Sequence, residues 1–293
     1  MGLKKTFYGA ARVVWLALAF GAWVSVDLGY TEPWLSFSDV PGGSTGALAG
    51  TAVAALTGYL LISTLHRGAE HAEWQETGQQ AGLSRVGDDR DASGPVLTGT
   101  VDGRTVTASY DKRKTGGGQD STRVTFTLCG AGLADPADHG LVVGSTGGTV
   151  DAGIGTLDFD DMAGTVSAVE GLVAAETGDL VLVGTSMAAI EAVDDGLSGD
   201  ALRAIEDLTI GSLGDASGVV TDWAEARNEE LEGSIVEFPV DNLAERVPGD
   251  AATVTVETKS SIRDGDELRR FAEGVVAIAD AFEEATGHTP ASG

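Results

Sequence analysis

The chain has one cluster of basic side chains, Lys112, Arg113 and Lys114, beside three glycines at positions 116–118. Basic groups at this spacing could bind an anion, such as a lipid headgroup, a phosphorylated ligand or an acidic partner. The alternative is a solvated hairpin loop. Molar salt favours that alternative, because a Debye length of about 3 Å screens long-range attraction to anionic lipids. These three residues are the candidate ligand-binding group.

A second group contains Asp158, Asp160 and Asp161, which surround Phe159. Three nearby carboxylates could hold a hard cation or carry out general acid–base chemistry. The chain has 45 acidic residues, however, so a short aspartate run is expected in an ordinary solvated turn. We therefore predict that these aspartates lie in a solvated turn.

The remaining motifs are incomplete. His66 and Glu70 share a helix face at four-residue spacing, but His71 does not lie on that face, and the chain has only four histidines. Residues 144–148 lack the lysine and the spacing of a phosphate-binding loop, and residues 184–188 lack the second glycine of a nucleophile elbow. No catalytic residue, metal or cofactor is predicted.

Two apolar segments near the N-terminus determine where the rest of the chain is placed. Residues 10–28 would span about 28 Å as a helix, close to the ~30 Å hydrocarbon layer, and residues 46–65 carry no charge. The first segment could instead be a signal peptide, but no small-x-small cleavage site follows it. Residues 1–65 are therefore predicted to form a two-helix transmembrane hairpin in the lipid bilayer.

The orientation of this hairpin follows from the charges in its loops. Lys4, Lys5 and Arg12 precede or begin the first segment and Arg67 follows the second, whereas residues 28–45 contain no lysine or arginine. Because basic loops stay on the cytoplasmic side, we predict a two-pass protein of the cell membrane with both termini in the cytoplasm.

Both segments carry small residues at four-residue spacing, which lets lipid-embedded helices approach closely. These residues are Ala17, Gly21 and Ser25 in the first segment, and Gly46, Gly50, Ala54 and Gly58 in the second. Packing of the two segments on each other is the favoured explanation. Contact with a protein partner or a homo-oligomer is the alternative.

The net charge of −27 belongs to the chain after residue 65, because residues 1–65 hold three basic and three acidic residues. A hydrophobic content of 42% argues against disorder, whereas scarce lysine and many carboxylates are typical of proteins folded at molar salt. Such a surface excludes the basic face that nucleic acid requires. Cys129 is the only cysteine, so no internal disulfide can form.

The chain after the hairpin divides into a juxtamembrane helix and linker, residues 66–95, and an acidic soluble domain, residues 96–293. Alternating segments flank Asp102-Gly103, which indicates a β-hairpin, and residues 264–286 have the apolar spacing of a long helix. Further strands are predicted at residues 122–129, 141–143, 180–183, 208–213, 218–223, 234–238 and 253–258, and helices at residues 162–175, 186–194, 198–208 and 240–247. This order predicts an α+β fold, a largely antiparallel sheet with a long C-terminal helix, as one domain or as two subdomains split near residue 155.

Four short motifs accompany the double span: residues 99–106 (GTVDGRTV), 123–127 (RVTFT), 178–185 (GDLVLVGT) and 214–218 (GDASG). With them the chain resembles a family of membrane-anchored proteins of unknown function from halophilic archaea. The resemblance covers most of the chain. It implies fold and location, and it supplies no catalytic residues.

Three functions are compatible with this sequence. The favoured one is a non-catalytic protein-interaction or scaffold module tethered to the inner face of the membrane. The second is a domain that binds or senses a lipid or a small anionic ligand through Lys112, Arg113 and Lys114. The third is a membrane-bound, hydrolase-like enzyme that uses the aspartates at residues 158–161.

Overall fold

The computed structural model describes residues 11, 13–19, 43–88, 94–111, 121–127, 139–151, 156–197, 199–206, 208–230, 240–244, 247 and 253–286. The chain divides into two compact units, residues 1–74 and residues 75–293. The second unit therefore begins before residue 96, the expected start of the folded domain.

Helix α2 (Gly43–Gln80) is long and apolar enough, by length and composition, to cross a membrane. None of its most apolar window is buried in the structure. Val53, Leu56 and Leu61 expose more than half of their side-chain surface, which is the expected state of side chains that face lipid. The segment predicted to be the second span thus lies in one helix that is long and apolar enough to cross a membrane, and the predicted two-helix hairpin stays a prediction.

The first predicted span is described only at residue 11 and residues 13–19, which are helical. Within this unit the indole nitrogen of Trp15 donates a hydrogen bond to the carbonyl of Ala55 (3.0 Å), and the ring occupies the space beside Gly58. Of the other small residues, Ala17 and Ala54 are exposed, Gly50 has no neighbour where its side chain would be, and Gly46 lies in the first turns of α2. Gly21 and Ser25 lie outside the described residues.

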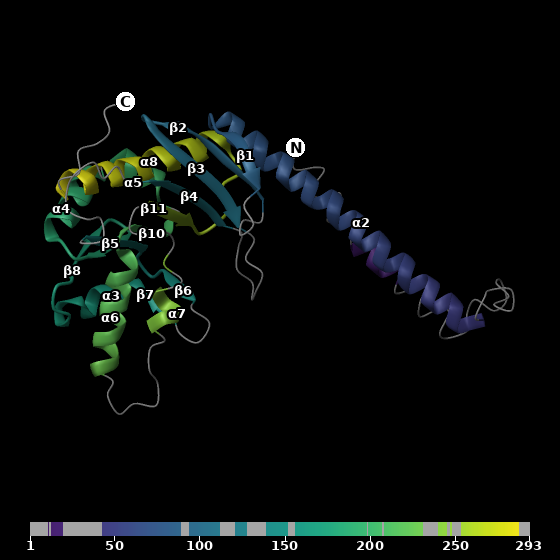
Figure 1. The fold of residues 1–293 in the computed structure, drawn as a ribbon, viewed down its shortest axis with the longest axis horizontal. Helices are drawn as coiled ribbons and strands as arrows, with labels where there is room; N and C mark the ends of the chain where they lie inside the picture. Colours follow the sequence, from purple (N-terminus) through teal and green to yellow (C-terminus); the bar gives the residue numbers. More distant parts are fainter. Residues whose placement is uncertain are drawn as a thin grey trace. The chain divides into compact units, whose positions relative to one another are not determined.

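In the second unit, nine strands among the described residues form one sheet (Figure 1). In spatial order they are β1 (Ser84–Asp88), β2 (Pro95–Val101), β3 (Arg104–Asp111), β4 (Ser121–Thr127), β11 (Thr253–Thr258), β10 (Leu208–Gly214), β5 (Gly140–Ser145), β9 (Leu180–Gly184) and β8 (Val173–Thr177). All eight neighbouring pairs are antiparallel. A separate hairpin contains β6 (Thr149–Asp151) and β7 (Thr156–Asp158). The predicted antiparallel sheet is confirmed.

Helices cover both faces of this sheet (Figure 1). One layer contains α4 (Met187–Gly196), α5 (Gly199–Ala204) and α8 (Gly265–Ala285). The other contains α3 (Phe159–Thr165), the 3-10 turn η3 (Val166–Ala168), α6 (Ala216–Glu230) and α7 (Val240–Ala244), whose apolar residues pack with Val142, Val181 and Ile210 of the sheet. The chain is an α+β protein with a long C-terminal helix, as predicted.

Several local predictions are confirmed in detail. The apolar stripe predicted for the last helix is fully buried at Leu268, Phe271, Val275, Ile278 and Phe282. The helix predicted at residues 186–194 is α4, and Ser186 caps it by accepting a hydrogen bond from the amide of Ala189 (3.3 Å). Asp102 and Gly103 both have positive φ angles, 47° and 82°, as a type I′ turn requires.

Other local predictions are wrong. Residues 218–223 were expected to form a strand but lie in α6, where Val219, Val220 and Trp223 are buried on one helical face. Residues 84–88, expected to be linker, form β1 and pair with β2. Residues 162–175 are not one helix, because α3 ends at Thr165 and β8 begins at Val173. Residues 234–238 lie outside the described residues.

Helix α8 is fixed to the sheet by a buried ion cluster. The guanidinium of Arg104 on β3 donates to Glu283 (3.0 and 2.5 Å) and to Asp280 (2.8 Å from Nε). Glu283 is fully buried and the side chain of Arg104 is 8% exposed. Burial alone lowers the pKa of Arg104, but the hydrogen bonds and charges of Glu283 and Asp280 outweigh it and raise that pKa above its usual value.

We expect Glu283→Ala to destabilise the protein by about 3 kcal/mol, because it leaves the Arg104 guanidinium partly unpaired inside the fold. Urea unfolding measures the change. The matched control is Glu284→Ala, whose side chain is exposed on the next position of α8, and it should leave the unfolding midpoint unchanged. Equal effects of the two substitutions would contradict a stabilising role for the ion cluster.

Candidate sites on the domain

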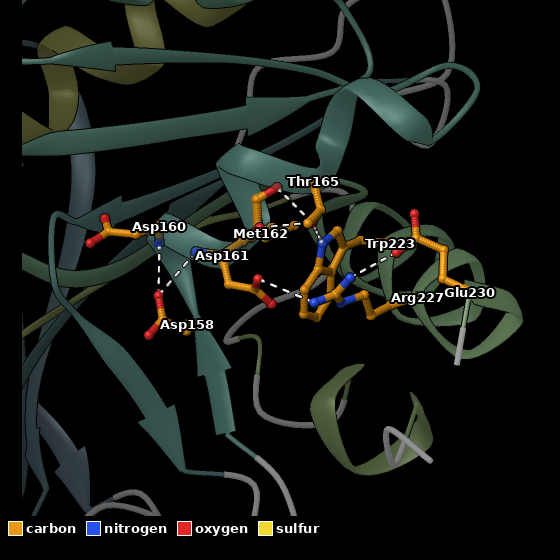
Figure 2. Close-up of polar contacts among 8 residues, drawn as sticks. All are labelled: Asp158, Asp160, Asp161, Met162, Thr165, Trp223, Arg227 and Glu230. Atoms are coloured by element: carbon orange, nitrogen blue, oxygen red, sulfur yellow. Dashed lines mark hydrogen bonds and ion pairs between the residues drawn. The ribbon is translucent and has the colours of Figure 1, made fainter. Parts of the chain in front are cut away.

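The three aspartates predicted to lie in a solvated turn are at the start of α3, where their carboxylates have separate partners (Figure 2). Asp158 caps α3 by accepting from the amides of Asp160 (3.0 Å) and Asp161 (3.1 Å). Asp160 accepts from the amide of Gly147 (3.0 Å), and Asp161 faces Arg227 of α6 (3.5 Å). The carboxylates therefore hold a helix start, a turn and a helix pair.

The group shown in Figure 2 continues from Asp161 to a buried tryptophan. Trp223 is 1% exposed, and its indole nitrogen donates to the hydroxyl of Thr165 (2.9 Å), which donates in turn to the carbonyl of Asp161 (2.7 Å). The hydrogen bond to Glu230 (2.7 Å) and the charge of Asp161 raise the pKa of Arg227. This chain of contacts joins α3 to α6, so Trp223 is an anchor between the two helices.

A cavity of about 10 Å³ lies beside Trp223, Thr165 and Arg227. The Nε atom of Arg227 is buried there without a protein partner. A volume of this size holds one water molecule, and a water can satisfy a buried donor. The niche is large enough for one water molecule and too small for a ligand.

The other predicted site residues fall in different places. Lys112, Arg113 and Lys114 lie outside the described residues. The Nε2 atom of His66 pairs with the carboxylate of its helix neighbour Glu70 (3.3 Å). Among the described residues, no three His, Cys, Asp or Glu side chains gather as a metal site would require.

The glycine-rich turn at residues 144–148 has a packing role. A side chain at Gly144 would collide with the ring of Phe159, because its first carbon would lie 2.2 Å from the ring. Strand β5 therefore needs glycine at position 144, where Phe159 of α3 packs against it.

Two features of the domain have no counterpart in the sequence motifs. The first is a cleft of about 750 Å³ between α5 and α8, which is within the usual range of small-molecule pockets. Ile262 and Phe271 form its apolar part, and its charged lining consists of Asp200, Arg203, Glu206, Glu267, Arg270 and Glu273. Arg203 is paired with Asp200. Because acidic and basic side chains both line the cleft, its charge does not favour one class of ligand.

The second feature is a row of hydroxyl side chains that crosses six strands in register. Its members are Ser84, Thr98, Thr107, Thr125, Thr255 and Ser212. The hydroxyls of Thr98 and Thr107 lie 3.4 Å apart, and those of Thr125 and Thr255 lie 3.3 Å apart. Such cross-strand pairs stabilise a sheet. The alternation of residues 253–258 places Thr255 on a strand, but it does not show which residues of the other strands lie beside it.

No protein-family model, curated protein or solved structure matches this chain. The resemblance to membrane-anchored proteins of halophilic archaea stays a prediction. Function is therefore inferred from the chain's own residues.

We expect Asp158→Ala to destabilise the domain by about 1 kcal/mol, because it removes the side chain that caps α3. Thermal unfolding measures the change. Asp158→Asn is the matched control: its side-chain oxygen can still accept from the amides of α3, so it should recover most of the stability. Equal losses in the two variants would show that the charge of Asp158, rather than the cap, is what matters.

Proposed function

We propose that this chain is a two-pass membrane protein whose α+β domain is a protein-interaction module at the cytoplasmic face. The carrying observation is that one helix, α2, contains the apolar segment and also ends inside the domain. Its residue Thr77 donates a hydrogen bond to the carbonyl of Arg263, just before α8 (2.8 Å). The last residues of α2, from Gln75 to Gln80, are therefore part of the domain.

The two-pass arrangement is supported by charge and by one contact. Basic residues precede the first apolar segment and follow the second, and residues 28–45 between them have none. The bond from Trp15 to Ala55 places the helix at residues 13–19 directly against α2. A hairpin brings the same two segments together.

An interaction role is favoured over catalysis by what the aspartates do. Asp158, Asp160 and Asp161 are the residues on which a hydrolase-like function would depend, and each has a distinct structural partner. A general acid or base needs a carboxylate that can reach a reacting proton. A scaffold needs only a tethered, stable surface.

The topology is tested by labelling single cysteines in intact cells with a membrane-impermeant maleimide. Cys129→Ser removes the only native cysteine; Ser38→Cys then places one in the connector, and Glu284→Cys places one on the exposed side of α8. We expect Ser38→Cys to be labelled in intact cells and Glu284→Cys only after permeabilisation. Labelling of Glu284→Cys from outside would contradict a cytoplasmic domain.

The interaction role is tested by purifying the tagged full-length protein from native membranes in mild detergent and molar KCl. We expect a stoichiometric protein companion, identified by mass spectrometry, that stays bound through the wash. Recovery of the chain alone, or with only lipid or a small molecule, would contradict the interaction role and favour ligand binding.

A further inference from the structure

The edge strand β8 presents backbone groups that no described residue satisfies. It pairs with β9 on one side only, through a two-residue turn at residues 178–179. The residues that flank such a turn exchange hydrogen bonds, so Thr177, Ala175 and Val173 bond to β9. The N–H and C=O groups of Ala174 and Glu176 therefore point away from the sheet.

The opposite edge of the sheet is built differently. The pairing of β1 with β2 is interrupted by a bulge between Arg85 and Gly87, and the strand carries the charged residues Arg85 and Asp88. Bulges and charges are the usual means of preventing a further strand from adding to an edge. The pairing of β8 is regular, and the strand (VAAET) has no proline or lysine and one charged residue, Glu176. Of the two edges, β1 alone has a bulge that hinders the addition of a further strand.

The surroundings of β8 define the charge of a strand that would fit there. Residues 124–202, which include β5, β9, β8 and α4, contain no lysine or arginine. Helix α4 packs against β8, and Thr177 bonds to Asp194 of that helix. The acidic residues on β8 and its neighbouring segments are Glu170, Glu176, Asp179, Glu191, Asp194 and Asp195. A second copy of this edge would bring like charges together, whereas a basic segment would be attracted.

The side chains of β8 set a further requirement. Val173, Ala174 and Ala175 are half-buried and small, and Ala174 packs against the core beneath α3 and α6. An incoming strand would therefore meet a narrow apolar surface with carboxylates around it. At molar salt only charges in close contact attract, and a paired strand brings its lysines or arginines to that distance.

We propose that β8 receives an extended basic segment of a partner protein, which adds to the sheet as one more strand. This inference rests on the proposed function and names the partner's chemistry: alternating small apolar and basic residues in an unfolded stretch.

The test uses the purified full-length protein in detergent and a fluorescent peptide, acetyl-KVTVKVTVK-amide. Fluorescence anisotropy at several KCl concentrations gives the dissociation constant. Ala174→Pro removes one outward N–H of β8 without removing a bond to β9, and it should weaken binding about tenfold or more. Ala174→Ser keeps the N–H group and is the matched control, with binding within about twofold of the wild type.

A second arm does not depend on folding of the proline variant. The same peptide, N-methylated at two adjacent central residues, keeps its charges but loses a donor on each of its edges. We expect it to bind the wild-type protein at least tenfold more weakly. Equal binding of both peptides would overturn the proposal, because charge alone would then explain the affinity. Equal binding to Ala174→Pro would also overturn it.

Two further outcomes separate this proposal from its premise. If the wild-type chain is a dimer that Ala174→Pro dissociates, the edge is occupied by a second copy and the basic partner is excluded. If the natural companion is retained equally by wild type and Ala174→Pro, β8 is not its site, although the interaction role stands. If no companion is retained by either, the proposed function itself fails.

Discussion

The burial of one sheet face beneath α8 is the constraint on which the α+β domain depends. A single register row on that face runs through Ala108, Val124, Val256, Gly211, Val143 and Leu182, on six different strands. Burial of apolar side chains is strong but has no direction, so it would allow a helix to slide along such a row. The hydrogen bonds of Arg104 prevent this sliding, because they hold Asp280 and Glu283 of α8 over strand β3.

The elements that could be predicted from the sequence are those with a local physical cause. The alternation of residues 253–258 and the apolar spacing of α8 each require one kind of secondary structure, and the Asp102-Gly103 turn needs two positive φ angles. Residues 218–223 lack such a cause: Val219, Val220 and Trp223 fit a short buried strand and a helix face equally well. Residues 84–88 have no apolar pattern, and they become a strand because β2 offers them an edge.

The candidate sites likewise divide into features that could be inferred from local residue types and features that depend on the whole fold. The interpretation of the aspartates as ordinary turn residues followed from the acidic composition, whereas the role of Asp158 as a cap required the structure, because the helix was expected to begin only at residue 162. The two partners of Arg104 lie more than 170 residues away in sequence, and the unpaired edge of β8 depends on which strands occupy the middle of the sheet. Neither can be derived from local residue types, because both are consequences of strand order.

That strand order also governs when the domain can fold. Strand β11, near the end of the chain, is the only link in the sheet between β4 on one side and β10 on the other. Until residues 253–258 leave the ribosome, the first four strands and the remaining four have no common sheet, while the apolar segments that precede them are already available for insertion. In the proposed membrane topology, the nascent chain is thus anchored long before it is folded. In that topology the many carboxylates of the unfolded segment would repel one another wherever strands come into close contact, which opposes premature pairing during synthesis.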